Sequence, residues 1–585
     1  MSPVHSMDSA EGPLVKRARK SYPDNNRSVS LFSVSARHPL NVKPGGNSLL
    51  ANSIDFKPSK SQQMGDFERF PEELLMEMFS YIQDPKSLMR LSHTSRIMYA
   101  YLYDEEIWRK LNTHKVLEGE RINQQSETLP WKGSWRCTLL RLEESKEAKL
   151  QLKDNLLCSD ILYRPFQCSK VDYSTLFSKI IKEESVYHQD SLNGDFDHTL
   201  LPSGRIARLA ESQLTLNEFN ENWSNKPFIL TNENENRWPV WTLNQLLERF
   251  PEVKFRQEVV QWPLKLYSEY LANNKDESPL YLFDCNSMAM KSLKQEYAPP
   301  KIFQPDFFKT FNHFSSKPCR PDYAWLIIGP KRSGSTFHKD PNSTSAWNAA
   351  ISGRKLWVML PPGTTPPGVG TDEEESEVTS PVGIAEWVIS GFFNDSLKIE
   401  SCQIGITFPG ECMYVPAGWW HSVINLDDSI ALTQNFVPQS QLCKVLNFLK
   451  NKHGQISGFK PKNVKLVMDE ILKSDKDINN ETLSKLREYT SIFESLDPHL
   501  QEEDCGEITS EKLPPMPIFE LFSQLMILGD NKQELEAGLE KLVKLEKNEL
   551  MKKTGKSEMW TKLTDEKQES VGFSFGFGFD ESDDE

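Results

Sequence analysis

Two histidines and one aspartate have a spacing that suits a metal centre. His338 and Asp340 are two residues apart, and His421 follows later in a Gly-Trp-Trp-His-Ser segment. Residues i and i+2 of an extended strand point to the same face, so the first pair is aimed at one point. Two imidazoles and one carboxylate leave three positions of an iron ion open for a cosubstrate and dioxygen. Because zinc sites close or keep one open position, the pattern favours Fe(II) and an oxygenase.

Lys355 is a candidate anion ligand close to this set. Strand alternation places it on one face with Trp357 and leaves Leu356 on the other. A lysine on an inward face needs an anion, and a dicarboxylate cosubstrate would supply one while hydroxyls such as Ser335 and Thr433 donate hydrogen bonds. The alternative is that Lys355 faces solvent, which is the usual place for a lysine.

The elements that must position these residues are strands. Between Trp325 and Phe436 short apolar alternations are separated by turns, which predicts a β-sandwich or barrel. Upstream, between about residues 205 and 330, short β-branched or aromatic runs alternate with helical stretches. The acidic run from Thr371 to Glu377 is too charged for a core strand and predicts a surface insertion. Asn435 shares a strand face with Thr433 and is a candidate supporting partner for the site.

Helical patterns flank the predicted sheet region. Leu75, Phe79 and Ile82 lie on one helical stripe that follows Pro71, and Asp84-Pro85 ends it. Trp108 and neighbouring apolar residues close a small helical unit, and residues 113 to 204 have the pattern of a helical linker. Leucine, isoleucine and phenylalanine again recur at helical spacing from Ser440 to about Lys553. The sequence therefore predicts helices on both sides of a β-rich domain.

Composition narrows the class of protein. The 585 residues carry a net charge of −15, which disfavours direct nucleic-acid binding. Nine dispersed cysteines without a Cys-x-x-Cys predict ordinary thiols in a reducing compartment, and no apolar run is long enough for a membrane span. A basic cluster at Lys16–Lys20 lies in a polar leader and is a candidate nuclear import signal, or else a solvated charge run. The Phe/Gly-rich acidic end of the chain is expected to be disordered.

The motifs around the candidate site resemble the Jumonji-C oxygenase domain, in its protein-hydroxylase branch. The resemblance covers about residues 205–440 and involves several linked motifs in one order. In chain order they are Ser278-Pro279-Leu280-Tyr281-x-Phe283-Asp284, Arg320-Pro321-x-Tyr323-x-Trp325, Gly334-Ser335-x-x-His338-x-Asp340, Thr344-Ser345-Ala346-Trp347-Asn348-Ala349, Gly353-x-Lys355-x-Trp357, Pro409-Gly410-Glu411, Val415-Pro416-x-Gly418-Trp419-Trp420-His421, Asn425-Leu426 and Ala431-x-Thr433-Gln434-Asn435-Phe436.

This resemblance implies a role for each candidate residue. The implied metal ligands and catalytic residues are His338, Asp340 and His421, which would hold Fe(II). The implied contacts to the cosubstrate 2-oxoglutarate are Ser335, Asn348, Lys355 and Thr433. Ser335 stands where an animal relative has threonine, which keeps the hydroxyl but loses a methyl group. The family reaction converts 2-oxoglutarate to succinate and CO₂ and hydroxylates a carbon of the substrate, while the protein positions the groups and excludes water.

The first helical unit resembles an F-box, which in its family binds the adaptor subunit of cullin ubiquitin ligases through apolar helix faces. Its motif begins with Phe70-Pro71 in place of the usual Leu-Pro. The whole order resembles the F-box/Jumonji-C proteins of fungi and plants. The expected fold class is α+β multidomain, with a helical F-box, a double-stranded β-helix (jelly-roll) Jumonji-C domain and a helical C-terminal region. The expected ranges are a leader 1–65, F-box 66–112, helical linker 113–204, oxygenase domain 205–440, helical region 441–555 and acidic tail 556–585.

The expected function is Fe(II)- and 2-oxoglutarate-dependent hydroxylation of lysyl or arginyl side chains in a protein, with the F-box joining the enzyme to a cullin ligase. Two alternatives stay open. One is histone demethylation by the same chemistry, although no histone-reading finger is evident. The other is a non-catalytic substrate receptor of the ligase. The nucleus is the expected location, with the cytoplasm as a second one, and the expected partners are the ligase adaptor and a protein substrate such as a histone or another nuclear protein.

Overall fold

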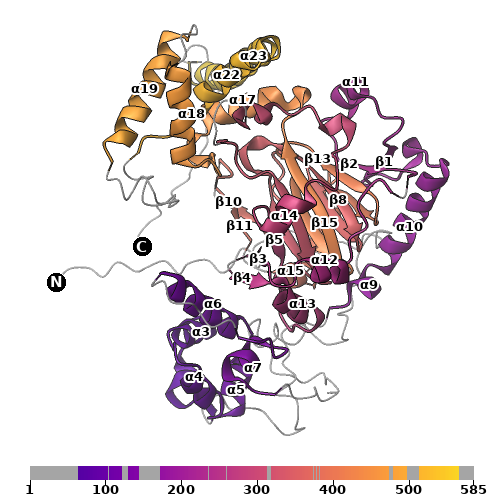
Figure 1. Ribbon diagram of the computed structural model, residues 1–585, viewed down its shortest axis with the longest axis vertical. Coiled ribbons are helices and arrows are strands. Elements are labelled where there is room, and N and C mark those ends of the chain that lie inside the picture. The colour runs from indigo at the N-terminus through magenta and orange to yellow at the C-terminus, as the bar shows by residue number, and fades with distance from the viewer. Residues whose placement is uncertain are drawn as a thin grey trace, which may run out of the picture.

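The computed structural model describes residues 63–565, apart from 103–104, 122–128, 144–170, 235, 259, 313–317, 373, 377, 381–382, 390, 474–477 and 497–512. The basic cluster and nearly all of the predicted leader lie outside the described residues, as does the Phe/Gly-rich end of the chain. Three parts follow one another in Figure 1: an N-terminal helical unit, a β-rich centre and a C-terminal group of helices. This order agrees with the predicted fold class.

The N-terminal unit is built from short helices with defined ends. Asp84 accepts hydrogen bonds from the backbone of residues 86 and 87 and caps the second main helix, which Pro85 begins. Leu75 and Phe79 are buried in the predicted stripe, and Trp108 is buried beside them. The elements are η2 (Gly65–Arg69), α3 (Glu72–Ser80), α4 (Pro85–Ser92), α5 (Arg96–Tyr101), α6 (Glu105–Arg121) and α7 (Trp135–Leu140).

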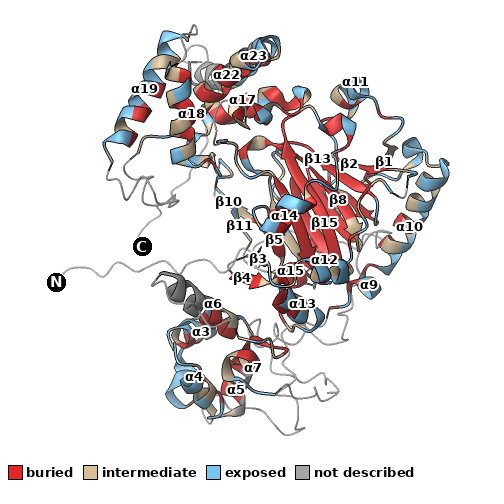
Figure 2. Ribbon diagram, viewed as in Figure 1, coloured by how far each residue is buried: buried red, intermediate tan, exposed pale blue. Residues whose placement is uncertain are grey.

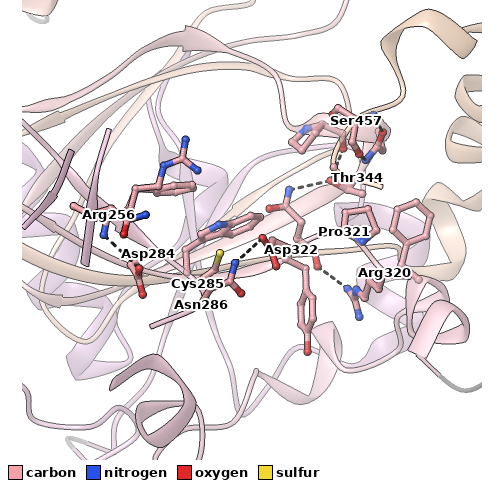
Figure 3. A pocket seen from close by; sticks show the side chains of 18 residues that line it. Arg256, Asp284, Cys285, Asn286, Arg320, Pro321, Asp322, Thr344 and Ser457 are labelled. Atoms are coloured by element: carbon pink, nitrogen blue, oxygen red, sulfur yellow. Dashed lines mark hydrogen bonds between the residues drawn. The ribbon is translucent and has the colours of Figure 1, made fainter. Parts of the chain in front are cut away.

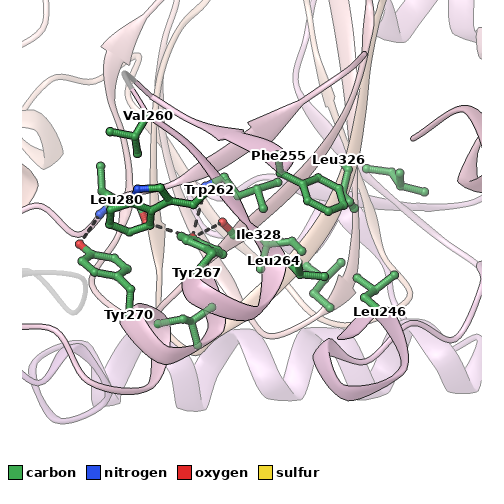
Figure 4. Packing of buried hydrophobic residues seen from close by; sticks show 14 of the residues in the cluster. Leu246, Phe255, Val260, Trp262, Leu264, Tyr267, Tyr270, Leu280, Leu326 and Ile328 are labelled. Atoms are coloured by element: carbon green, nitrogen blue, oxygen red, sulfur yellow. Dashed lines mark hydrogen bonds between the residues drawn. The ribbon is translucent and has the colours of Figure 1, made fainter. Parts of the chain in front are cut away.

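Hydrogen bonds fasten this unit to the β-rich centre. The indole of Trp135 donates to Asp276 at 2.9 Å, and Tyr270 donates to the same carboxylate at 2.5 Å. Arg109 donates to the backbone carbonyl of Ser278 at 2.9 Å. Figure 4 shows the adjoining packed cluster, in which Tyr270 lies beside residues of the sheet. The linker after α6 therefore includes a buried contact between the two parts.

Two facing sheets make the centre. The larger has the order β1-β2-β13-β8-β15-β6-β5-β3-β4 and the smaller β12-β9-β14-β7. Their strands are mainly antiparallel, and β1 and β2 pair in parallel. The strands are β1 (Ala207–Ala210), β2 (Phe228–Thr231), β3 (Lys254–Gln257), β4 (Val260–Pro263), β5 (Leu282–Asp284), β6 (Ala324–Gly329), β7 (Gly334–His338), β8 (Ser345–Ser352), β9 (Lys355–Leu360), β12 (Gln403–Thr407), β13 (Cys412–Val415), β14 (Trp420–Asn425) and β15 (Ser429–Phe436).

Side chains on these strands alternate between two kinds of core. Leu356 and Val358 of β9 belong to a cluster on the outer face of the small sheet. Trp357 and Met359, one residue out of step, pack with residues of the large sheet in the space between the sheets. Figure 2 shows buried residues along the strands at the centre of the large sheet, β8, β13 and β15. The alternation predicted for this strand is confirmed, and it directs Lys355 toward the interior.

Helices and one hairpin complete the centre. The acidic insertion is held between β10 (Gly370–Thr371) and β11 (Val378–Thr379), which pair with each other. The remaining helices include α9 (Tyr173–Leu176), α10 (Ser178–Asn193), α11 (Leu216–Glu218), η5 (Phe219–Trp223), α12 (Leu243–Arg249), α13 (Leu264–Ala272), α14 (Met288–Leu293), η7 (Phe307–Asn312), α15 (Ile384–Ile389) and α16 (Phe392–Leu397). The hairpin makes the acidic run an insertion, as predicted.

The C-terminal helices pack on the edge of this domain through a core of their own. Phe308 and Phe311 of η7 lie in the same cluster as Leu446 and Phe522. The helices are α17 (Leu442–Asn451), α18 (Pro461–Lys473), α19 (Asn480–Glu494), α22 (Ile518–Leu528) and α23 (Lys532–Asp565). No helix in the described ranges combines the length and the apolar character needed to cross a bilayer.

Candidate functional site

The three predicted metal ligands come together at one end of the small sheet. His338 ends β7 and pairs directly with His421 of β14, and their ring centroids are 4.2 Å apart. Asp340 follows β7, and its Oδ2 lies 4.0 Å from Nε2 of His421. The ligand set was expected from spacing within β7, but the distant histidine reaches it only through the pairing of β7 with β14.

Hydrogen bonds orient each of these groups. Nδ1 of His338 lies 2.8 Å from the carbonyl of Thr336, and Nδ1 of His421 lies 3.1 Å from the carbonyl of Trp419. A carbonyl only accepts, so each Nδ1 is the donor in this contact, and Nε2 is the ring nitrogen left for a metal. Asn435 donates to Oδ1 of Asp340 at 3.0 Å, while Oδ2 is buried without a hydrogen-bond partner among the described residues. The free atoms are therefore those that a metal would use.

Burial sets the protonation of the group. It lowers the pKa of His421 well below its usual value, and the neighbouring His338 lowers that pKa further. Burial also raises the pKa of Asp340, against the opposing effects of His338 and Asn435. Neutral imidazole is the metal-binding form, and a cation would remove the cost of burying the carboxylate. The donor set fits a divalent metal.

The three candidate ligands lie close together, but their donor atoms are farther apart than they would be around a bound metal ion. Adjacent donors on an octahedral ion lie about 3 Å apart, which is less than the separation between His421 and Asp340. Accordingly, within the described ranges no group of three His, Cys, Asp or Glu side chains has the geometry of a formed metal site. The assignment of His338, Asp340 and His421 as iron ligands stays a prediction that the residue chemistry supports.

Lys355 lies in the interior between the sheets. It is fully buried, and its Nζ donates to Oδ1 of Asn425, the residue directly opposite on β14, at 2.8 Å. Asn425 in turn donates to Oγ of Ser333 at 2.8 Å. Burial lowers the pKa of Lys355 to about 7. An amide oxygen does not neutralise an ammonium, so this position suits an anionic group such as the distal carboxylate of 2-oxoglutarate.

Asn348 and Thr433 face the same interior from the large sheet. They are register partners on β8 and β15. Oδ1 of Asn348 is buried and has no hydrogen-bond partner within the part of the chain that the structure describes. The hydroxyl of Thr433 donates to the carbonyl of Trp347 at 2.8 Å. The predicted cosubstrate contacts therefore come from both sheets, and Asn348 has spare hydrogen-bonding capacity.

Ser335 reaches this interior through an irregularity in β7. It pairs with Val423, whereas His338 pairs with His421, so the register shifts between the two pairs. In a regular strand, residues three apart face opposite sides. The bulge turns both Ser335 and His338 toward the inside. The sequence analysis did not predict this bulge.

A cavity of about 770 Å³ opens onto His338 and Asp340, two of the predicted metal ligands. Its walls come from the acidic hairpin and from the C-terminal helices, including Phe448 of α17 and Leu545 of α23. The sequence prediction assigned no role in the site to either segment. Only the packing of the C-terminal helices on the domain brings them to this mouth.

A second cavity of about 420 Å³ is lined in part by Asn435, the residue that donates to Asp340. Figure 3 shows its residues, among them Asp322, which accepts from Asn286 at 3.0 Å. Phe283 and Trp325 stack at 5.1 Å on the face of the large sheet that carries Thr433. The face of the large sheet that carries Thr433 therefore also carries this aromatic pair.

Comparison with known proteins matches both halves of this architecture. A family model described as a cupin-like domain covers residues 215–441, and one described as F-box-like covers residues 67–114. Arginine-specific demethylase JMJ22 of Arabidopsis thaliana is 32% identical over 430 residues, which are 71% of this chain and 76% of that protein. Lysine-specific demethylase JMJ21 of the same plant is 31% identical over 64% of this chain and 37% of its own length.

An animal relative matches the central domain. The bifunctional arginine demethylase and lysyl-hydroxylase psr-1 of Caenorhabditis elegans is 34% identical over 251 residues, which are 40% of this chain and 61% of that protein. The chain thus spans about three quarters of the first plant relative and less than two thirds of the other two.

Proposed function

This chain belongs to the Jumonji-C oxygenases that carry an F-box, and on that premise we propose that it is an Fe(II)- and 2-oxoglutarate-dependent hydroxylase of lysyl or arginyl side chains in proteins. One observation carries the proposal. An open set of two histidines and one aspartate lies in the same sandwich as a buried lysine that has no anionic partner among the described residues. A metal alone would explain the first group and an anion alone the second. An iron with an acidic cosubstrate explains both.

Each side chain then has a defined task. Nε2 of His338, Nε2 of His421 and the free oxygen of Asp340 would hold the iron, and Asn435 keeps the carboxylate in place. The ammonium of Lys355 would bind the distal carboxylate of 2-oxoglutarate. With iron bound, dioxygen would be the oxidant: one of its atoms would enter succinate as 2-oxoglutarate loses CO₂, and the other would enter the hydroxyl group of the substrate. The packed interior around the site excludes water.

His338→Ala tests the enzyme. We expect the purified wild-type chain with Fe(II) to convert 2-oxoglutarate to succinate. The rate in the variant should be lower by more than about 100-fold, because removing a metal ligand has a larger effect than removing a residue that hydrogen-bonds to a ligand. Succinate is measured by mass spectrometry. His93→Ala, an exposed histidine of the helical unit, is the matched control and should keep the rate. Equal turnover in His338→Ala and wild type would refute the proposed site.

Demethylation is a second candidate because both plant relatives and psr-1 are named as demethylases. Hydroxylation of an N-methyl carbon would use the same site and release formaldehyde, whereas hydroxylation of a side-chain carbon leaves one added oxygen on the peptide. Comparing peptides from wild-type and His338→Ala cells by mass spectrometry distinguishes the two products.

We propose that the F-box joins the enzyme to a cullin ubiquitin ligase through its adaptor subunit. The helical unit leaves Leu74 and Tyr81 exposed at 40% and 75%, beside the buried stripe of α3. Leu74→Asp should reduce capture of the adaptor by the full chain in a pull-down and leave succinate formation unchanged. Leu200→Asp changes an equally apolar exposed residue outside this unit and is the control. Undiminished capture by Leu74→Asp would remove this surface from the proposal.

The non-catalytic receptor remains the contrasting hypothesis. If His338→Ala fully replaced the wild-type chain in cells while still binding the adaptor, the receptor function would account for the biology. We also propose a nuclear location, with a nuclear or chromatin protein as substrate, which localisation of tagged chain with and without the basic cluster at Lys16–Lys20 would test.

A further inference from the structure

The cavity of about 770 Å³ that opens onto His338 and Asp340, here called the entrance cavity, has few carboxylates in its wall, which bears on the substrate it could bind. Among its described lining residues the only carboxylates are those of Asp340 and Glu375. Asp340 is committed to the candidate metal site. Glu375, on the acidic hairpin, is therefore the one lining carboxylate left for a substrate.

Glu375 is aimed at the cavity and already binds a cation. It adopts a left-handed backbone conformation with φ of 54°, which is uncommon for a residue other than glycine. Its carboxylate pairs with Nζ of Lys339, which lies between the two ligands His338 and Asp340 in sequence. Both side chains are about three-quarters buried, at 22% and 23% exposure. The pair therefore lies at the wall of the cavity beside the metal ligands.

The C-terminal helices hold this hairpin in place. Lys452 donates to the backbone carbonyl of Glu374 at 2.7 Å, so the residue next to Glu375 is tied to the segment that follows α17. Phe448, Ile456 and Val378 add apolar surface to the same cavity. A carboxylate beside apolar walls suits a long side chain with a hydrocarbon stem and a cationic end.

We propose that Glu375 is the residue that recognises the cationic lysyl or arginyl side chain of the protein substrate, and that Lys339 occupies this position until the substrate displaces it. The proposal rests on the proposed function and names its specificity residue. Lys339 is then an internal competitor, since an ammonium on a flexible stem resembles the substrate side chain. The other lining lysines are held elsewhere: Lys444 donates to Asn225 at 2.8 Å, and Lys452 to a backbone carbonyl.

Binding of small probes to the full-length chain tests this inference without relying on turnover. The probes are N-acetyl-lysine methylamide and N-acetyl-arginine methylamide, with the neutral N-acetyl-norleucine methylamide for comparison, titrated by ligand-observed NMR. In the wild type the cationic probes should bind more tightly than the neutral one. Glu375→Gln should weaken the cationic probes by about tenfold and remove the preference. Lys339→Met should tighten them because the competitor is gone.

Glu374→Gln is the matched control. It removes the same charge from the same hairpin, but the Glu374 side chain is exposed and the contact with Lys452 uses the main chain. It should behave as the wild type. The proposal is overturned if Glu375→Gln keeps the wild-type preference, if Glu374→Gln loses as much, or if the wild type shows no preference. Absence of succinate formation in the wild type would instead refute the proposed function, whatever the probes show.

Discussion

Two groups of buried charge lie in the same domain and differ in how they are paired. Where β1 of the large sheet adjoins β12 of the small sheet, Arg208 donates to Glu184 at 2.9 Å and to Glu411 at 3.0 Å, and Arg205 binds Glu184 at 3.0 Å. Burial alone would raise the pKa of Glu411, but Arg208 and His188 lower it. Between the sheets, Lys355 is equally buried and has only an amide oxygen as its described hydrogen-bond partner.

The difference in pairing distinguishes buried charges that stabilise the fold from buried charges that could bind a ligand. A buried charge that finds its counter-ion within the chain helps to hold elements together. Here Glu184 of α10 is held by Arg208 of β1, which also binds Glu411 just before β13. A buried charge without one costs free energy that a ligand of opposite charge can recover. Oxygens of Asp340 and Asn348 in the same interior are also buried without a hydrogen-bond partner among the described residues. Burial is the same in the two groups, so the presence or absence of a counter-ion is what distinguishes the structural network from the candidate site.

Arg208→Met should produce the largest loss of stability. It leaves Glu184 and Glu411 buried with less positive charge, and breaking a buried ion pair costs about 3–5 kcal/mol. The free energy of unfolding from urea titration measures the loss. Lys485→Met removes a partly exposed cation that pairs with Glu481 and Glu520, and it should cost less than about 1 kcal/mol. Similar losses of unfolding free energy in the two variants would mean that the buried ion pairs stabilise the fold no more than a partly exposed pair does.

Lys355→Met should weaken ligand binding without reducing the stability of the fold. We expect 2-oxoglutarate affinity to fall by about 10–100-fold, because charge-assisted hydrogen bonds are lost. Thermal stability of the free chain should stay equal or rise, because a buried charge without a counter-ion is removed. Calorimetric titration and a melting curve measure the two effects. A strong fall in melting temperature would place Lys355 with the structural charges instead.

The smallest effect is expected from pH. The pKa of Lys355 is lowered to about 7 in the free chain, so its ammonium is present below that pH and is lost above it. Affinity for 2-oxoglutarate should therefore weaken by about fivefold between pH 7 and pH 8, since the charged fraction falls from about one half to about one tenth. Lys355→Arg stays charged over this range and should show a flatter profile. Equal profiles for the two chains would show that another group controls binding.

Much of the fold followed from local patterns. The stripe through Leu75 and Phe79 and the alternation around Lys355 depend on neighbours in sequence, and both have the predicted form, although α3 ends at Ser80, before Ile82 and Asp84-Pro85. The cupin-like and F-box-like matches agree with the expected architecture. The entrance was missed because Glu375 and Phe448 meet there only through the packing of distant segments, which leaves no periodic signal.

The sequence by itself determined the residue types of the site and the face on which Lys355 lies, because strand alternation is a local property of the backbone. Tertiary structure decided the rest. The register of β7 against β14 brought His421 to His338, and a bulge turned Ser335 inward. The docking of α17 and the acidic hairpin placed Glu375 at the mouth. These depend on pairings between segments far apart in the chain, which are set by the packing of the whole domain.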